Sequence, residues 1–496
     1  MASSATESKG STPTYQFGPL ERRGLILGFS AGQVILVAGG AVGAVFLAVG
    51  GAAPLGLGVL LAGLWLSFWP LAGHTAHEWI PIVGAYWLRR LCGAARWRND
   101  APCLGHVGTE PPWPHLPTHL AGHRVLRTVG PGGSLMGVLR RGSTYTAVLA
   151  VRPQAFALCD SEEQARRLAG WGATLAGLAR EGSPVTRLQW MERTAPADDG
   201  ELLRAARAAL TVPETHPLAA SYLQLVESAG PATQAHEAYV AVQIDAGRAR
   251  RLVKAAGGGD SGALTVLRRE LATLASALAG AEVTVEGALS SRALARAIRV
   301  AFDPGTRAGL ARRAALDPER AGVAPAACWP SATEEEWACY RSDDSYHAVY
   351  WVEEWPRTPV RPAFLSPLLL GTRCARVVSL TVEPLSPATA TRQVERARTQ
   401  DVADEEMRLR GGFLSTARRR RQAEGTARRE EELADGHADC RFSGYVAVSA
   451  PDEEALEAAC GEVEQLAQQC RLQLSRLRGQ QEEAFAWTLP LCQGLR

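Results

Sequence analysis

The chain has 496 residues and a formal net charge of +2, with 53 lysines and arginines against 51 acidic residues. This near balance gives no case for bulk nucleic-acid binding, and the length is enough for two or three compact units. The ten cysteines form no C-x-x-C pair. We therefore expect free thiols and no cofactor.

The N-terminal region combines a polar tail with a long segment that carries no charge. Residues 1–18 are predicted to be a disordered tail, since the first part is rich in Ser and Thr. Between Gly24 and Ala76 there is no Asp, Glu, Lys or Arg, and two apolar blocks occupy 25–49 and 55–71. A helix needs about 20 residues to cross the roughly 30 Å hydrocarbon core of a bilayer. The two blocks therefore predict a transmembrane helical hairpin.

The residues that flank this hairpin indicate its orientation. We expect a two-span membrane anchor over residues 19–98, with arginines before the first block and after the second and an uncharged turn between them. Basic residues near span ends stay in the cytoplasm, and tryptophans prefer the interface. Both termini are therefore expected on the cytoplasmic side of a bacterial inner membrane. The residues expected to hold the anchor in the lipid are Arg22, Arg23, Trp65, Trp69, Trp79, Trp87, Arg89 and Arg90.

The segment 79–97 is predicted to be a helix that lies on the inner leaflet, with its arginines near lipid headgroups. The apolar residues that recur there at helical spacing are Trp79, Ile82, Val83, Tyr86 and Leu91. The alternative is that this helix packs on the soluble part of the chain. His74, His77 and Glu78 precede it without forming the H-E-x-x-H zinc motif, and they are predicted to cap the second span.

The remaining chain is too polar to stay in lipid and is predicted to form two cytosolic α+β modules. Residues 99–144 are expected to be a linker, because 106–123 is rich in Pro and His. The modules are assigned to 145–310 and 346–496, with a proline-containing connector at 311–345. Alternating strand and helix signals predict ferredoxin-like sandwiches rather than a doubly wound parallel sheet.

Apolar periodicity places the elements of both modules. In the first, strands are predicted at 145–151, 185–191, 238–244 and 283–285, and helices at 161–180, 201–210, 218–227, 263–279 and 291–302. In the second, strands are predicted at 347–352, 375–382, 445–449 and 484–488, and helices at 387–435 and 452–477. A capping box from Ser161 to Gln164 is expected to begin the helix at 161. The helix at 387–435 is expected to break at Gly411 and Gly412.

Known nucleotide and nucleophile motifs fail on specific residues. A P-loop requires G-x-x-x-x-G-K-[ST], but Lys9 and Lys254 are the only lysines and neither stands in that context. The run Gly132-Gly133-Ser134 is not a nucleophile elbow, because Met136 stands where the last glycine belongs. We therefore expect no enzyme activity, and an ATPase partner would have to be a separate polypeptide.

Two residue clusters have the composition of binding sites. Cysteine and histidine spacing in the linker loosely resembles a zinc site, but the segment is proline-dense and a surface linker is the preferred interpretation. The residues concerned are Cys103, His106, His115, His119 and His123. The basic run 418–421 is followed by acidic residues, which is typical of a solvated helix, so direct nucleic-acid contact is not expected.

The chain resembles two kinds of secretion machinery. Segments 15–20 and 73–81 resemble the PrgI family of conjugative type IV secretion subunits, and 445–491 resembles the non-catalytic N-terminal half of transfer ATPases of the TrbE/CagE class. As a whole the chain is similar to an actinobacterial two-span membrane family. The anchor, together with 350–356 and 380–384, also resembles EccE of type VII secretion.

These resemblances imply a structural and docking subunit of a secretion complex. The main hypothesis is a type IV-like complex in which the chain binds membrane lipid, a separate P-loop ATPase and polytopic secretion proteins, as part of an oligomeric assembly. The alternative is an EccE-like component of a type VII system. A membrane-tethered enzyme is the contrasting hypothesis, and it would need a pocket around Asp343, Asp344 and His347.

Overall fold

A computed structural model describes most of the chain, and its contacts divide it into two units. The described residues are 17, 31–71, 74–99, 116–152, 156–196, 199–229, 234–371, 373–410 and 417–495. One unit, here called the body, comprises Met1–Phe17, Arg96–Ala390 and Asp435–Arg496. The other, the anchor unit, comprises Gly18–Ala95 and Thr391–Ala434.

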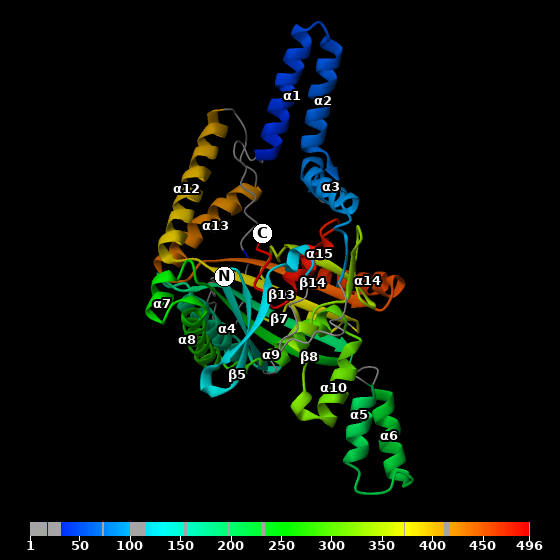
Figure 1. Ribbon diagram of the computed structural model, residues 1–496. Helices are drawn as coiled ribbons and strands as arrows, with labels where there is room; N and C mark the ends of the chain where they lie inside the picture. The colour runs from blue at the N-terminus through cyan, green and yellow to red at the C-terminus, as the bar shows by residue number, and fades with distance from the viewer. Residues whose placement is uncertain are drawn as a thin grey trace. The chain divides into compact units, whose positions relative to one another are not determined.

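The anchor unit contains an apolar helical hairpin. Its helices α1 (Ala31–Val49) and α2 (Ala53–Phe68) are joined by a tight turn in which Gly51 has a φ of +83° (Figure 1). Two short strands, β1 (Pro70–Leu71) and β2 (His74–Thr75), lead to α3 (Ala76–Leu91). Only the stretch Gly32–Val49 is long and apolar enough to span a membrane among the described helices, because α2 has 16 residues.

The predicted helical region 387–435 is divided at its glycine pair, as expected. Helix α12 (Pro387–Arg410) ends directly before Gly411, and α13 (Ala417–Ala434) follows. The two helices are connected by an ion pair between Arg398 and Glu430 and by a hydrogen bond from Thr426 Oγ1 to Asp401 Oδ2 of 3.0 Å.

The body is built on one antiparallel sheet of 13 strands. In spatial order the main path is β3 (Arg96–Arg98), β10 (Ala332–Glu335), β11 (Tyr340–Ser342), β12 (Ser345–Glu354), β14 (Cys440–Ala450), β13 (Ala375–Pro384), β7 (Val185–Pro196), β8 (Gln234–Asp245), β6 (Thr144–Arg152), β5 (Leu135–Arg141) and β4 (His123–Val129). Two further strands lie off this path, since β15 (Gln473–Arg476) pairs with β12 and β9 (Thr284–Ala288) pairs with β6.

Helices cover both faces of the sheet. One face packs against α4 (Ser161–Leu178), α8 (Gly259–Gly280), α11 (Ser366–Leu370) and α14 (Glu453–Gln469). The opposite face packs against α9 (Ser291–Phe302), α15 (Gln481–Trp487) and the residues that follow α15. The other helices of the body are α5 (Asp199–Ala208), α6 (Pro217–Ala229), α7 (Arg250–Ala255) and α10 (Thr306–Leu316). The pair α5 and α6 projects away from the sheet (Figure 1).

The same order of elements occurs twice in the body. The first repeat runs β4-β5-β6-α4-β7-β8-α8-β9-α9, and the second runs β10-β11-β12-α11-β13-β14-α14-β15-α15. The inner strands lie in the order β9-β6-β8-β7 in the first repeat and β15-β12-β14-β13 in the second. A pair of helices is inserted at the same point of each repeat, α5 and α6 after β7, and α12 and α13 after β13.

Details of hydrogen bonding repeat as well. The hairpins β5-β6 and β11-β12 both have two-residue turns, and the first turn residue has a positive φ in each, Gly142 at +58° and Asp343 at +49°. The carbonyl of Val148 accepts from Leu289 N at 2.8 Å, and the carbonyl of Val349 accepts from Leu477 N at 3.0 Å. Each of these carbonyls lies six residues beyond its turn residue in the numbering.

The two repeats are related by a local two-fold axis between β7 and β13. In this antiparallel pair Met191 lies opposite Ser379. Three residues away on either side, Thr194 pairs with Arg376 and Leu188 pairs with Val382. Because the adjoining strands β8 and β14 keep matching registers, the two halves of the sheet are topologically equivalent.

The structure corrects several boundaries predicted from the sequence. Residues 123–141, expected to belong to the linker, form β4 and β5, and the expected connector contains β10 and β11. The segment 484–488, expected to be a strand, lies mostly in α15, because it is buried on all sides and its periodicity is uninformative.

The helix predicted at 452–477 ends at Gln469, where Arg471 adopts a φ of +58° and β15 follows. The N-cap of α4 is Asp160, whose carboxylate accepts from Glu163 N at 2.8 Å, so the Ser161 capping box was wrong.

Candidate functional site: the apolar hairpin and the polar core of the body

Small residues line the interface between α1 and α2. The buried positions of α2 are Gly56, Gly63 and Ser67, and Gly40 is the buried position of α1 among its described residues. A Cβ atom at Gly56 would lie 2.6 Å from the carbonyl oxygen of Ala44. Glycines therefore allow the two backbones to approach closely, which is the usual packing of helices in lipid, where dispersion contacts replace the hydrophobic effect.

The large apolar side chains of the hairpin point outward instead. Phe46 is 81% exposed and Val49 is 86% exposed. Other exposed side chains are Ile35, Val42, Val45, Leu55, Leu57 and Leu61. Contiguous apolar surface of this kind is unfavourable in water and marks a membrane or protein contact.

The polar groups inside the hairpin are satisfied within it. Ser67 Oγ donates to the carbonyl of Gly63 at 2.7 Å, and Gln33 Nε2 donates to the carbonyl of Ser67 at 3.0 Å. An unsatisfied polar group costs several kcal/mol in hydrocarbon, so this arrangement suits an apolar surrounding.

Helix α3 begins at the residues that were predicted to cap the second span. Glu78 Oε2 accepts from Thr75 N at 2.9 Å, and Thr75 is the N-cap. His77 packs against Gly32, where an added Cβ would lie 2.6 Å from its ring. These residues therefore start α3 instead of ending α2, because the capping box T-x-x-E satisfies the free N–H groups of a following helix.

The exposed face of α3 differs from the one predicted. Tyr86 is buried, and Trp79, Ile82 and Val83 are partly buried, whereas only Leu91 of the predicted set is exposed, at 81%. The apolar residues that point outward are Ile80, Trp87, Leu88 and Leu91. Helical spacing alone did not separate these two faces, since both carry apolar residues.

The predicted anchoring residues occupy the ends of α2 and α3. Trp65 and Trp69 stack on each other with ring centroids 5.8 Å apart, and both are exposed. Trp79 and Trp87 lie on α3, and Arg89 and Arg90 lie in its last turn, where cations interact favourably with the helix dipole. Arg90 Nη1 donates to Tyr86 Oη at 2.8 Å. Arg22 and Arg23 lie outside the described residues.

In the body, an aromatic contact ties an N-terminal residue to the second repeat. The ring of Phe17 lies 5.2 Å from that of Trp355 and 5.5 Å from that of Phe364, measured between centroids. Trp355 in turn lies edge-on to Phe442 at 5.5 Å. Phe17 lies in segment 15–20, which resembles PrgI, and Trp355 lies in 350–356, which resembles EccE.

A buried charge cluster joins β7 and β8 to the helices that follow. Glu237 Oε atoms lie 3.4 Å from Arg193, 3.1 Å from Arg296 and 3.8 Å from Arg307, and Tyr239 Oη donates to Glu237 at 2.9 Å. Burial by itself would raise the pKa of Glu237, but the arginines and the tyrosine outweigh it and the pKa is lowered. Sequence reasoning missed this cluster, because its members lie far apart in the chain.

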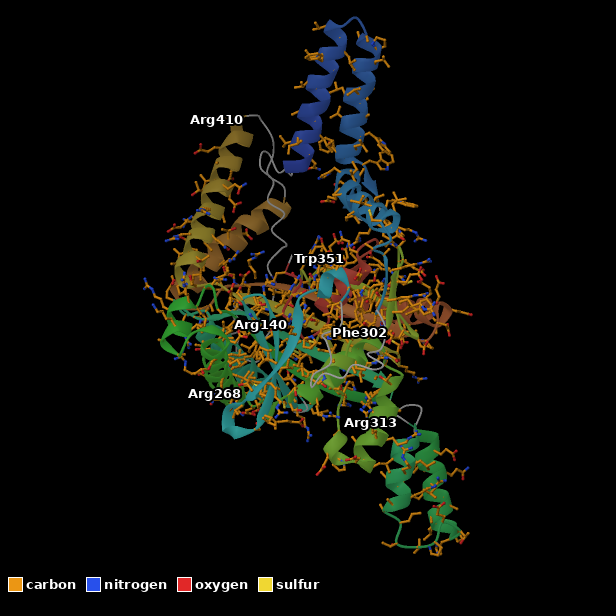
Figure 2. All side chains as sticks on the ribbon, in the orientation of Figure 1. Arg140, Arg268, Phe302, Arg313, Trp351 and Arg410 are labelled. Atoms are coloured by element: carbon orange, nitrogen blue, oxygen red, sulfur yellow. The ribbon has the colours of Figure 1, made fainter. Side chains whose placement is uncertain are left out.

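His347 is a structural residue of the sheet. It is fully buried, with Nε2 2.8 Å from Ser342 Oγ and Nδ1 2.8 Å from Ser449 Oγ. Ser342 Oγ also donates to the carbonyl of Phe302, at the buried end of α9 (Figure 2), at 2.6 Å. Burial lowers the pKa of His347 to about 4. A neutral, enclosed imidazole of this kind braces β11, β12 and β14.

Asp343, Asp344 and His347, which the enzyme hypothesis requires, have different surroundings in the structure. Asp343 Oδ1 accepts from the backbone N–H groups of Ser331 and Ala332, at 2.7 and 3.1 Å, and Asp343 Oδ2 lies 2.6 Å from Arg299. Asp344 is exposed, whereas His347 is enclosed between strands. The three side chains therefore do not meet in one cleft.

The cysteine and histidines whose spacing loosely resembles a zinc site form no cluster in the part of the chain that the structure describes. His123 is buried, with Nδ1 2.8 Å from the carbonyl of Leu120 and Nε2 3.2 Å from Gln493 Nε2, and burial lowers its pKa to about 4. No group of three His, Cys, Asp or Glu side chains suited to a metal occurs among the described residues. Cys103, His106 and His115 lie outside those residues, as do the side chains of 418–421.

The middle of the body is similar to one known protein family. A model of the family described as "Putative type VII ESX secretion system translocon, EccE" matches residues 232–352, about a quarter of the chain. This segment runs from β8 through β12 and contains Glu237, Arg299, Asp343 and His347. No curated protein gives a significant match to the chain. The family match points to a component of a secretion-system translocon, which suggests a membrane location, and no comparison supports the type IV resemblance.

We predict that Gly56→Val disrupts the hairpin while Gly58→Val does not. A side chain at Gly56 would collide with the backbone of α1, whereas an added Cβ at Gly58 meets nothing within 4 Å. The purified variants should be compared by the temperature at which they aggregate in detergent. Gly56→Val should aggregate at a clearly lower temperature than the matched control. Equal temperatures for both variants would contradict the close packing of α1 and α2.

The buried histidines predict that acid destabilises the body. His347 has a pKa of about 4 when folded and about 6.5 when unfolded, so only the unfolded chain binds a proton between these values. The free energy of unfolding should therefore fall on acidification from pH 7 to pH 4.5, by about 1.4 kcal/mol per pH unit for each such histidine. His347→Gln should flatten this slope, whereas His216→Gln, at an exposed position, should leave it unchanged. An unchanged slope in His347→Gln would contradict the assignment.

Proposed function

We propose that this chain is a membrane-anchored structural subunit of a type VII-like secretion translocon, similar to EccE. The observation that carries the proposal is the match of residues 232–352 to the EccE family, in a chain that also has an apolar N-terminal hairpin. The type IV hypothesis, which was the main one from sequence, has no observation in its favour.

The anchor in this proposal consists of both helices of the hairpin. Helix α2 rises about 24 Å over its 16 residues, less than a full hydrocarbon core, and the stacked Trp65 and Trp69 lie at its end. Tryptophans prefer the interface, and a bilayer that thins slightly around α2 accommodates a helix of this length. Arginines lie in the sequence before the first helix and after the second, at the ends away from the connecting turn, and this favours cytoplasmic termini.

The body in this proposal acts in assembly and not in catalysis. The partly buried Glu237 and Asp343 and the buried His347 are engaged in hydrogen bonds and ion pairs that hold strands and helices together. The strand order within each repeat supports the ferredoxin-like type predicted from sequence. Energy for transport would come from a separate P-loop ATPase.

Copurification tests this function. The tagged chain should be extracted from its native membrane in mild detergent, and its partners should be identified by quantitative mass spectrometry. We expect type VII membrane components and a separate ATPase in fixed ratios to the chain. Gly56→Val should lose these partners while Gly58→Val retains them. Recovery of type IV components would replace the proposal, and recovery of the chain alone under several mild conditions would contradict an assembly role.

A further inference from the structure

The two ends of the sheet differ in whether an additional strand pairs with the outer edge. At one end β3 pairs with the outer edge of β10. At the other end β4 is the last strand of the sheet path, and within the described residues no strand pairs with its outer edge. Since β4 and β10 are equivalent strands of the two repeats, the edge of β4 corresponds to one that binds a further strand.

The registers define this equivalence residue by residue. Ser342 lies opposite Ser345 across the β11-β12 turn, as Arg141 lies opposite Thr144 across the β5-β6 turn. Ser342 pairs with Thr333 of β10, and Glu334 is the next residue of that strand. In the first repeat Arg141 pairs with His123 of β4, and Arg124 is the next residue, so Arg124 corresponds to Glu334. The β3 residue that pairs with Glu334 is Arg96.

The charge at this position is reversed between the repeats. In the second repeat Arg96 of the added strand lies 2.6 Å from Glu334 of β10. In the first repeat Arg124 replaces the glutamate, and Arg127 follows on the same strand. Both arginines are exposed, and neither has an ion-pair partner among the described residues. A strand that complements β4 would therefore carry acidic residues where β3 carries arginine.

The backbone and the end of the hairpin add two further features. Gly130 N donates to the carbonyl of Ser134, so the antiparallel alternation turns the backbone groups of Arg127 and Val129 toward the outer edge. Val129 and Leu135 lie opposite each other at this end and are 46% and 50% exposed. Among the described residues, the edge thus offers backbone groups without a strand partner, Arg124 on one face of the sheet, and Arg127 with a small apolar contact on the other.

We propose that the β4 edge binds an acidic, extended segment of a partner protein as an additional β-strand. This is strand addition, in which backbone hydrogen bonds supply affinity and side chains supply specificity. An unprotected edge would otherwise be an aggregation risk, and the arginines on β4 limit pairing with unselected apolar strands. The inference rests on the internal repeat and does not depend on which secretion system the chain serves.

A synthetic strand tests the proposal with the full chain in detergent. The probe is a fluorescent nonapeptide with alternating glutamate and valine, and anisotropy reports its binding. Two control peptides carry either lysine in place of glutamate or N-methyl groups on alternate amides, which remove the edge hydrogen bonds. We expect saturable binding of the acidic peptide and at least tenfold weaker binding of both controls.

Two variants separate strand addition from simple charge attraction. Arg127→Pro removes an outward N–H and should weaken binding at least tenfold, and the fold should tolerate it because proline is accepted on a free edge. The change Arg124→Glu should reverse the preference toward the lysine peptide, because Arg124 is the residue that corresponds to Glu334. Thermal unfolding should stay within a few degrees of the unsubstituted chain for both. Absence of saturable binding, or equal binding of the N-methylated peptide, would overturn the proposal.

Discussion

The body depends on the pairing of β7 with β13. β7 and β13 are the outermost strands of the two repeats in spatial order, and their pairing joins the repeats into a single sheet. Met191 lies opposite Ser379 on the local two-fold axis. Strands in this position are covered on both faces, so every polar group there needs a partner. Arg193 Nη2 accordingly donates to the carbonyl of Ala297 at 2.6 Å, and the Nη atoms of Arg376 donate to the carbonyls of Leu368 and Leu369. The Nε atoms of both arginines are buried without a partner among the described residues.

Residues 487–493 cover the central strands of the sheet and form hydrogen bonds with them. Gln189 Nε2 donates to the carbonyl of Trp487 at 2.9 Å, and Gln189 Oε1 accepts from Cys492 N at 2.8 Å. Thr381 Oγ1 donates to the carbonyl of Gln493 at 2.9 Å, and Gln243 Nε2 donates to that of Leu491 at 3.1 Å. Strands of both repeats thus bind the backbone of the segment 487–493. The repeats are therefore bound to each other by the hydrogen bonds between β7 and β13 and by a segment that both repeats contact.

The sequence was informative where a single physical signal decides the structure. The charge-free segment predicted the apolar hairpin, and apolar runs located strands such as β8 and β14. The sequence was uninformative where long-range pairing decides the structure. β4 and β5 carry apolar residues but follow a Pro- and His-rich stretch, so they were assigned to the linker. The pairing of β7 with β13 has no local signal. In the hairpin, Gly56 and Gly63 pack closely against α1. Two glycines seven residues apart in α2 are the sequence signal for this packing, and the large apolar residues around them carry no information about it.

Hydrogen exchange of the full chain in detergent tests the central pairing most directly. Amides of interior strands exchange slowly because they open only with large parts of the structure. If β7 and β13 pair as described, peptides covering Val185–Pro196 and Ala375–Pro384 should exchange as slowly as those covering β8 and β14, and much more slowly than those covering the edge strand β4. Fast exchange of β7 and β13, at the rate of β4, would mean that each ends a separate sheet and would contradict the two-repeat body.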